Sequence, residues 1–194
     1  TRGAEALGGE LDGVVITVPA YFHEAQRQAP RDAARLAGLN VLRLLSEPTA
    51  AAVAYGLDTK LQGTVIIYDL GGGTFDVSLM KLERGVFEVL GTGGNAALGG
   101  DDFDRAIADW IMKEAQITTG LSTPEYQQLM VLTRELKHSL TESTSTSVQF
   151  RNWIGTLNRD TYYGLVDGMI DETIRACRRV LRDASIDAAA ISEV

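Results

Sequence analysis

The feature that most constrains the fold of this chain is an apolar run that leads into a triplet of glycines. Residues 65–70 are nearly all apolar, which predicts a strand buried on both faces of a sheet. Gly71, Gly72 and Gly73 then predict a tight turn. After the turn, residues 75–79 alternate apolar and polar side chains, which predicts a return strand with one buried face.

Strand-like and helix-like segments alternate along the rest of the chain, which predicts an α/β fold. Further strands are expected at residues 14–18, 41–45, 86–90, 148–150 and 154–157. Helices are expected at residues 23–37, 48–55 and 166–184. Two more are expected to begin at N-caps, one at Asp101 or Asp102 and one at Thr123. Pro30 falls inside the first of these helices, where proline removes a backbone hydrogen bond. We expect it either to kink that helix or to begin a second one.

The net charge of −8 argues against a nucleic-acid-binding protein, because such proteins usually carry a basic face. It is compatible with a nucleotide ligand, which needs only a local pocket. No apolar run reaches the roughly 18 residues that a membrane-spanning helix needs, and no signal peptide opens the chain. With 194 residues, 45% of them hydrophobic, the chain is long enough for one large domain or two small ones.

Cys177 is the one cysteine in the sequence, so no intramolecular disulfide can form, which suits a reducing cytoplasm. It falls on the apolar stripe of the last expected helix, where a structural role is favoured over a nucleophilic one. His23 and His138 are far apart in the sequence, and nothing has the spacing of zinc ligands.

The glycine turn and the residues that flank it form the first candidate site. Three successive glycines let backbone N–H groups point into one concavity, with no Cβ to block a phosphate. Asp69, at the end of the strand, can reach a magnesium ion through a coordinated water, and the Thr74 hydroxyl can contact a terminal phosphate or hold a water. The run is not a Walker loop, because no Gly-Lys-Ser/Thr follows it. A plain hairpin turn is the alternative for the glycines taken alone.

Two further runs carry acidic side chains where a helix is expected to begin. Glu47 precedes Pro48 and Thr49, and residues 98–104 read Leu-Gly-Gly-Asp-Asp-Phe-Asp. A carboxylate at a helix start is favourable in itself, because it offsets the helix dipole. Capping is therefore the simpler interpretation of each run taken separately.

Together, four runs in this order resemble the DnaK-type chaperones of the heat shock protein 70 family. They are residues 17–22 (Thr-Val-Pro-Ala-Tyr-Phe), residues 47–58, residues 69–76 (Asp-Leu-Gly-Gly-Gly-Thr-Phe-Asp) and residues 98–104. The resemblance extends from about Leu11 to the end of the chain. Within the family, residues 39–45, 84–90 and 176–179 look most like the HscA branch, which serves iron–sulfur cluster assembly.

The resemblance implies an actin-like ATPase (ribonuclease H-like) fold, an α/β fold whose mixed sheets and helices form two lobes around a nucleotide cleft. On that map residues 1–60 form the inner part of lobe I, and residues 61–99 and 171–194 form the inner part of lobe II. Residues 100–170 form its outer part, a smaller α+β subdomain. The chain is then expected to be an excised piece without the first phosphate hairpin, the adenosine loop or the peptide-binding domain. Such a piece is expected to fold but not to bind ATP tightly.

The resemblance also implies roles for individual residues. Glu47 and Asp69 match the acids around the magnesium ion and the attacking water, and Thr74 matches a residue of the phosphate loop. The glycines 71–73 match the part of that loop at the β- and γ-phosphates, and Lys137 matches a lysine near the adenosine. The expected catalytic residues are therefore Glu47, Asp69 and Thr74. The expected cofactors are ATP or ADP and Mg²⁺, with K⁺ as a further candidate ion.

Other matches imply partners. Pro19 and Arg27 match a relay between the cleft and the surface, and Arg43 matches an arginine used by J-domain partners and the interdomain linker. The expected partners are a J-type co-chaperone, an iron–sulfur scaffold protein as client and the peptide-binding domain of the same protein, in the cytoplasm of a bacterium. A sugar or glycerol kinase and a nucleotide-dependent filament protein share the fold and stay alternatives. The Glu-Pro-Thr-Ala and Leu-Gly-Gly-Asp-Asp-Phe-Asp runs favour the chaperone.

The helix around Lys137 departs from the common pattern of the family, in which a glutamate often stands one turn before the lysine. Here Arg134 takes that place and His138 follows the lysine. Residues four apart lie on one helix face, so charges on Arg134 and His138 would repel each other. We therefore expect a weak clasp over the adenosine and rapid release of ADP.

Overall fold

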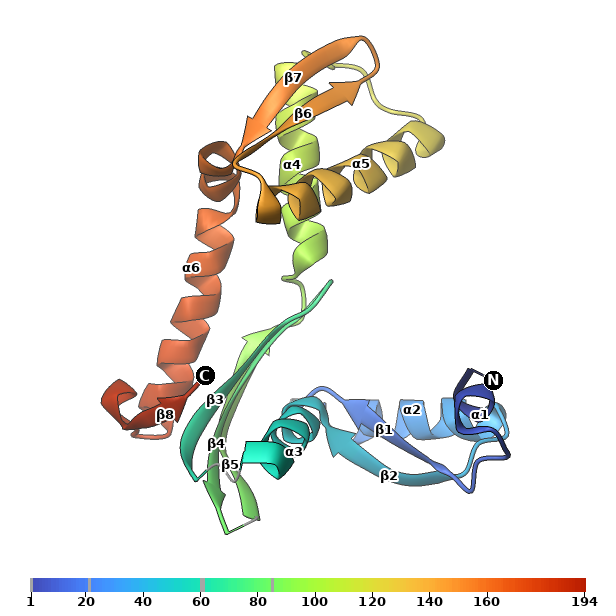
Figure 1. The fold of residues 1–194 in the computed structure, drawn as a ribbon, viewed down its shortest axis with the longest axis vertical. Coiled ribbons are helices and arrows are strands. Elements are labelled where there is room, and N and C mark those ends of the chain that lie inside the picture. The colour runs from blue at the N-terminus through green and yellow to red at the C-terminus, as the bar shows by residue number, and fades with distance from the viewer. Residues whose placement is uncertain (1, 21, 60–61, 85) are drawn as a thin grey trace. The chain divides into compact units, whose positions relative to one another are not determined.

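The computed structural model describes residues 2–20, 22–59, 62–84 and 86–194, which form two compact units. Unit 1 comprises Thr1–Asp69, Asp76–Gly93 and Cys177–Val194, and unit 2 comprises Leu70–Phe75 and Gly94–Ala176. Each unit combines strands with helices (Figure 1), so the predicted α/β class is confirmed.

The expected division into inner and outer parts of two lobes stays a prediction. Its boundary at Lys60 and Leu61 lies outside the described residues. The same holds for Tyr21 in the first of the four runs and for Gly85 in the turn expected before residue 86.

Unit 1 begins with α1 (Arg2–Leu7), which was not expected, and continues with a two-stranded parallel sheet. β1 (Val14–Val18) pairs with β2 (Val41–Ser46), and α2 (Glu24–Leu36) connects the two strands. Parallel strands cannot be joined by a tight hairpin and need such a crossover. The predicted order of strand, helix and strand is therefore confirmed.

α2 begins at a capping box and runs through Pro30. The Nδ1 of His23 accepts a hydrogen bond from the Gln26 N–H (3.4 Å), and the Gln26 Oε1 accepts one from the His23 N–H (3.1 Å). The helix is continuous with Pro30 inside it, so the alternative of a second helix beginning there is wrong. Proline removes the bond to the carbonyl four residues earlier, and its ring crowds that carbonyl. That carbonyl belongs to Gln26, an exposed residue, so water can replace the missing donor.

α3 (Glu47–Thr59) follows β2 directly, and a four-stranded sheet in the order β5-β4-β3-β8 comes next. The strands are β3 (Gly63–Leu70), β4 (Phe75–Glu83), β5 (Val86–Asn95) and β8 (Ile191–Glu193). β8 pairs in parallel with β3, with Thr64 opposite Ile191. The end of the chain thus extends a sheet whose other strands lie far earlier in the sequence.

β4 is an inner strand of this sheet, and the expectation of a single buried face is wrong. All of residues 75–80 are buried, including Asp76 and Ser78, which are 5% and 1% exposed. A strand between two neighbours can be covered on both faces whatever its polarity pattern. β3, by contrast, is buried at Val65 and Ile66 but exposed at residues 68–69, so it emerges from the core just before the glycine turn.

Unit 2 packs helices and a β-hairpin around an apolar core. α4 (Gly100–Glu114) and α5 (Thr123–Glu142) contribute to this core together with β6 (Ser145–Phe150) and β7 (Trp153–Asn158). α6 (Arg159–Asp183) follows β7, and its residues after Ala176 belong to unit 1. The core residues with no exposed surface are Ile107, Ile111, Leu129, Val148 and Leu157.

In unit 2, α4 and α5 are capped one or more residues earlier than expected. Gly99 is the N-cap of α4 in place of Asp101 or Asp102, and the Asp102 carboxylate accepts a hydrogen bond from the Gly99 N–H (2.8 Å). Ser122, not Thr123, is the N-cap of α5. In α4, Asp102 lies in the first turn, and its side chain accepts a hydrogen bond from the cap residue. The sequence alone does not distinguish this arrangement from one in which the acid is itself the cap.

Cys177 is partly buried in α6, and burial raises the pKa of its thiol. A thiol with a raised pKa stays protonated near neutral pH and is a poor nucleophile. This favours the structural role expected for it.

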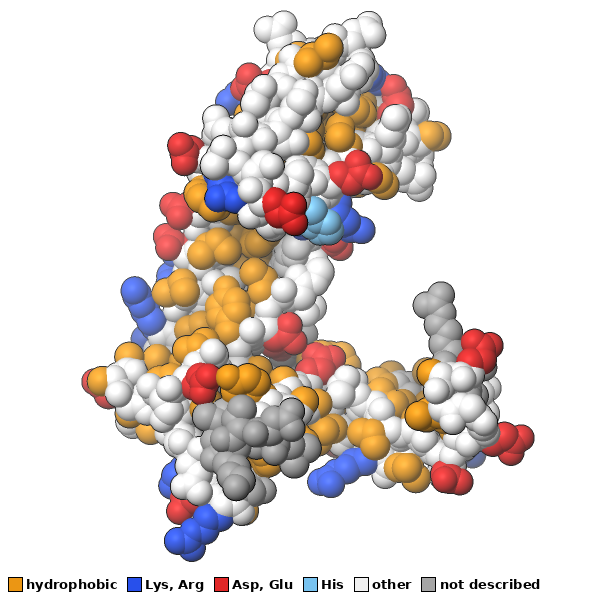
Figure 2. Space-filling view, in the orientation of Figure 1, with side chains coloured by type: hydrophobic (Ala, Val, Ile, Leu, Met, Phe, Trp, Pro, Cys, Tyr) orange, Lys and Arg blue, Asp and Glu red, His pale blue; other side chains and the backbone are white. Residues whose placement is uncertain are grey.

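The surface of the described residues is mixed in character. Figure 2 shows acidic and basic side chains interspersed over unit 2 on the face in view. None of the helices in the described ranges is both long enough and apolar enough to cross a membrane.

β7 offers a matched pair of apolar side chains for a test of the core, since Leu157 is 0% exposed and Ile154 is 70% exposed. Leu157→Ala is expected to lower the free energy of unfolding of unit 2 by about 2–5 kcal/mol, because it leaves a cavity. Ile154→Ala should change it by less than about 0.5 kcal/mol. Urea unfolding followed by tryptophan fluorescence reports on this unit, because Trp110 and Trp153, the two tryptophans of the chain, both lie in it. Equal losses in the two variants would contradict the burial of Leu157.

Candidate functional site

The glycine turn after β3 is closed by its own backbone. The Gly71 N–H donates to the Thr74 carbonyl (2.8 Å). Gly72 and Gly73 are exposed, and no described atom lies within 4 Å of the points where their Cβ atoms would be. One side of the turn is therefore open, and an anion such as a phosphate can approach the backbone there.

The other side of the turn rests on the first residues of α4. The Gly100 N–H donates to the Gly71 carbonyl (2.9 Å), and the Asp101 N–H donates to the Gly72 carbonyl (2.7 Å). The first amides of a helix have no partner within the helix, and here they bind the turn. The amides at this helix start are thus already used, and the open side of the glycine turn is the part left to receive an anion.

Gly99 allows this close approach. A Cβ on residue 99 would lie 2.5 Å from the carbonyl carbon and oxygen of Gly72 and 2.6 Å from the nitrogen of Gly73. These are backbone atoms, which cannot rotate away as a side chain can. The φ of Gly99 is −167°, ordinary extended backbone, so glycine is needed here for space and not for its backbone angle. The runs at residues 69–76 and 98–104 therefore form one structure.

Lys137 supports the same structure from α5. Its Nζ donates to the Gly100 carbonyl (2.8 Å) and lies 2.7 Å from the Oδ1 of Asp104. The side chain is only 18% exposed, and that of Asp104 has no exposed surface. The residue expected near an adenosine is thus held beside the segment on which the glycine turn rests.

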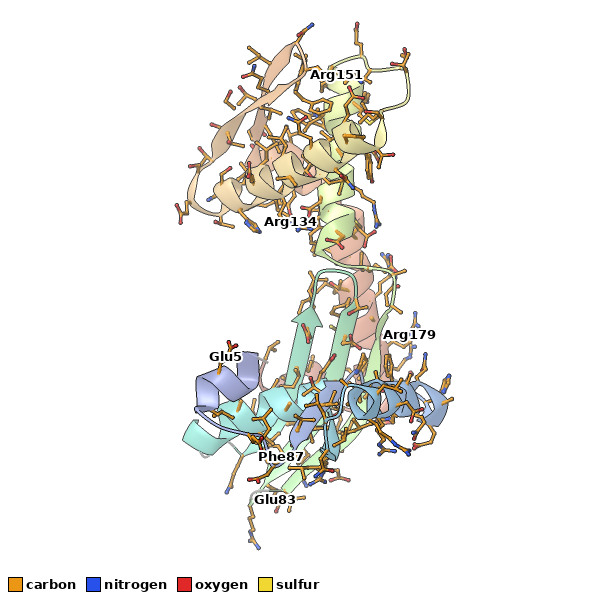
Figure 3. All side chains as sticks on the ribbon, turned by 90° about the vertical axis from the view of Figure 1, so that its right-hand side faces the viewer. Glu5, Glu83, Phe87, Arg134, Arg151 and Arg179 are labelled. Carbon is orange, nitrogen blue, oxygen red and sulfur yellow. The ribbon has the colours of Figure 1, made fainter. Side chains whose placement is uncertain are left out.

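Arg134 is paired with two acids of α4. Its Nε lies 3.3 Å from the Oδ2 of Asp104, and its Nη2 donates to the Oδ1 of Asp101 (3.0 Å). Figure 3 labels Arg134 on α5. An arginine thus replaces the expected family glutamate and ties α5 to α4. The rapid release of ADP stays a prediction.

Glu47 and Asp69 form an acidic pair within unit 1. Glu47 is the first residue of α3, and Asp69 lies near the end of β3. Burial, and next the negative charge of Asp69, raise the pKa of Glu47. A carboxylate that only caps a helix is instead favoured in its charged form by the helix dipole. Capping alone therefore does not describe Glu47, whose carboxylate lies close enough to Asp69 to be repelled by it.

A magnesium ion fits these two carboxylates, because it prefers oxygen ligands and would offset their repulsion. Within the described ranges no three His, Cys, Asp or Glu side chains form a group that could hold a metal. Glu47 and Asp69 would therefore hold Mg²⁺ together with water or ligand oxygens, which suits an ion that usually keeps several waters.

The residues expected to serve coupling lie in unit 1. Arg27 fastens the loop after β1, because its Nε donates to the Phe22 carbonyl (2.8 Å) and its Nη2 to the Ala20 carbonyl (3.2 Å). Pro19 begins the same loop. Arg43 lies on β2 and is exposed. Arg27, on α2, thus holds the loop that Pro19 begins.

Asp104 was not among the expected site residues, although its spacing carries a signal. Asp104, Ile107, Ala108 and Ile111 have the i, i+3, i+4, i+7 spacing of a buried helix face, and all four are buried. An acid on such a face requires a partner of opposite charge. The sequence does not show that Lys137 and Arg134 are these partners, because they belong to another helix.

Comparison with known proteins gives matches along the whole chain. Residues 1–194 match the family described as Hsp70 protein. The chain is 54% identical over 193 residues to the chaperone protein HscA homolog of Aliivibrio salmonicida and 56% identical over 193 residues to that of Azotobacter vinelandii. Each alignment covers 100% of this chain and 31% of the relative. The chain therefore spans about a third of the length of the curated relatives it matches.

Gly99→Ala is expected to separate the glycine turn from α4, because the added methyl would meet backbone atoms at 2.5–2.6 Å. Amide hydrogen exchange measured by mass spectrometry should then be faster by about tenfold or more at residues 100 and 101, whose amides bind the turn. Gly168→Ala, in open space on α6, is the control and should leave this exchange unchanged. Unchanged exchange in Gly99→Ala would contradict the contact.

Proposed function

The chain belongs to the Hsp70 family, and on this premise we propose that it forms part of the ATP-binding and ATP-hydrolysing domain of a molecular chaperone. The fold of that family is the actin-like ATPase fold. The observation that carries the proposal is the glycine turn, fixed on α4 through two backbone hydrogen bonds and open on its other side.

In this proposal the turn binds the phosphates of ATP or ADP. The N–H groups of Gly72, Gly73 and Thr74 would donate to phosphate oxygens, because a concave set of amides attracts an anion. Lys137 would lie near the adenosine. K⁺ stays a further candidate ion.

Glu47 and Asp69 carry the catalytic part of the proposal. When bound between them, Mg²⁺ would neutralise charge on the phosphates. The two carboxylates would orient a water for attack on the terminal phosphate, and the Thr74 hydroxyl would hold that water or a phosphate oxygen.

The proposal extends to partners of the full-length protein. Arg43, exposed on β2, would bind a J-type co-chaperone and the interdomain linker. Pro19, which begins the loop after β1, and Arg27, which fastens that loop from α2, would couple the nucleotide site to that surface and to a peptide-binding domain. The HscA names of the relatives support a role in iron–sulfur cluster assembly. A scaffold protein as client and the bacterial cytoplasm as location are further parts of the proposal.

The test of this function is single-turnover ATP hydrolysis by the full-length protein. Glu47→Gln, Asp69→Asn and Thr74→Ala should each slow hydrolysis by about 10²-fold or more, since each removes one pre-positioned group. Their affinity for ADP should change far less, because the glycine turn is intact. Asp109→Asn, an exposed acid on α4, is the control. Near-normal hydrolysis in all three variants would refute the assignment.

A further inference from the structure

Asp104 carries a buried charge that the proposed function does not use. A carboxylate without exposed surface is unfavourable unless it is paired. Its two basic partners differ in distance and in exposure. The Nζ of Lys137 lies 2.7 Å from Oδ1, and the Lys137 side chain is 18% exposed. The Nε of Arg134 lies 3.3 Å from Oδ2, and the Arg134 side chain is 58% exposed. The contact with Lys137 is shorter and better shielded from water, so it is the stronger of the two.

The Lys137 ammonium extends this interaction to the glycine turn. It donates to the Gly100 carbonyl (2.8 Å), and the Gly100 N–H donates to the Gly71 carbonyl (2.9 Å). A Cβ on residue 100 would lie 3.3 Å from the Lys137 Nζ and 3.7 Å from the Gly71 oxygen, so these groups are closely packed. Asp104, Lys137, Gly100 and Gly71 therefore form an unbroken series of polar contacts within unit 2.

We infer that Asp104 is a positioning residue for nucleotide binding, which holds the Lys137 ammonium against the Gly100 carbonyl and so fixes the segment that supports the glycine turn. This inference rests on the proposed function, because it assigns Asp104 to the same site. Asp104 itself does not touch the nucleotide. It acts through Lys137, which links the adenosine side of the site to its phosphate side.

Asp104→Asn should therefore weaken ADP binding more than it slows chemistry. The asparagine keeps the shape of the side chain and removes its charge, so Lys137 loses the group that orients it. The dissociation constant of ADP and the KM for ATP should rise about tenfold. The kcat should stay within about twofold, because the groups at Glu47, Asp69 and Thr74 are unchanged.

Two controls separate positioning from general loss of stability. Leu157→Ala removes a buried side chain of the same unit and should leave the affinity for ADP unchanged at a temperature where the protein is folded. Arg134→Ala removes the exposed partner of Asp104 and should weaken ADP binding by less than about threefold, because Lys137 keeps its contact. A loss of affinity in Leu157→Ala equal to that in Asp104→Asn would overturn the inference.

The decisive experiment is a double-mutant cycle on the ADP affinity of the full-length protein, with Asp104→Asn, Lys137→Met and the two combined. If Asp104 acts through Lys137, the double variant binds ADP no more weakly than Lys137→Met alone. If the two losses multiply, Asp104 acts by another route and the inference is wrong. Absence of ADP binding in the unmodified protein would instead refute the proposed function.

A second measurement needs neither nucleotide nor the Asp104 variant, in case the latter does not fold. Lys137→Met leaves Asp104 paired with Arg134. It should accelerate amide hydrogen exchange at residues 100 and 101, because the Gly100 carbonyl loses its donor. Exchange as slow as in the unmodified protein would show that Lys137 does not hold this segment, and it would overturn the inference.

Discussion

The site depends on a contact between two backbone segments that leaves no room for a side chain. Gly99 lies so close to Gly72 and Gly73 that a Cβ there would approach their backbone atoms to 2.5–2.6 Å. Two hydrogen bonds from the first amides of α4 complete the contact. α4 is in turn held by Ile107 and Ile111, which have no exposed surface. The apolar core of unit 2 thereby helps to determine where the glycine turn lies.

Each unit holds carboxylates in surroundings that are unfavourable for an unpaired charge. Asp104 is buried beside Lys137 in unit 2, and in unit 1 the pKa of Glu47 is raised by burial and by Asp69. Carboxylates in such surroundings are typical of functional sites. In the proposed function these carboxylates have different roles. Glu47 and Asp69 attract a cation, and Asp104 keeps the Lys137 ammonium in place.

The sequence predicted features that depend on local signals. The glycine turn and the strands beside it have residue types that restrict the backbone wherever they occur, whereas the course of the helix through Pro30 was left open. The sequence-based prediction of burial was wrong where burial depends on residues far away in the chain. Asp76 and Ser78 alternate with apolar residues, yet they are buried because β4 lies inside the sheet.

For the candidate site, too, the sequence indicated local features but not contacts between distant segments. Asp69 and Thr74 were proposed as site residues from the residue types around the turn, and the family resemblance added Lys137. The partnership of Lys137 with Asp104 is a contact between two helices, and local spacing does not specify it. The closeness of Gly99 to the turn likewise joins two separate runs, which is why each run alone had a simpler interpretation.

The most direct measurement of the central claim is NMR of the full-length protein labelled with ¹⁵N-glycine, titrated with Mg-ADP and, separately, with adenosine. If the open side of the turn binds phosphates, Mg-ADP shifts the amide signals of Gly72 and Gly73 strongly, and adenosine leaves them nearly unchanged. Saturable binding of Mg-ADP that leaves both signals in place would contradict the claim, because the phosphates would then bind elsewhere.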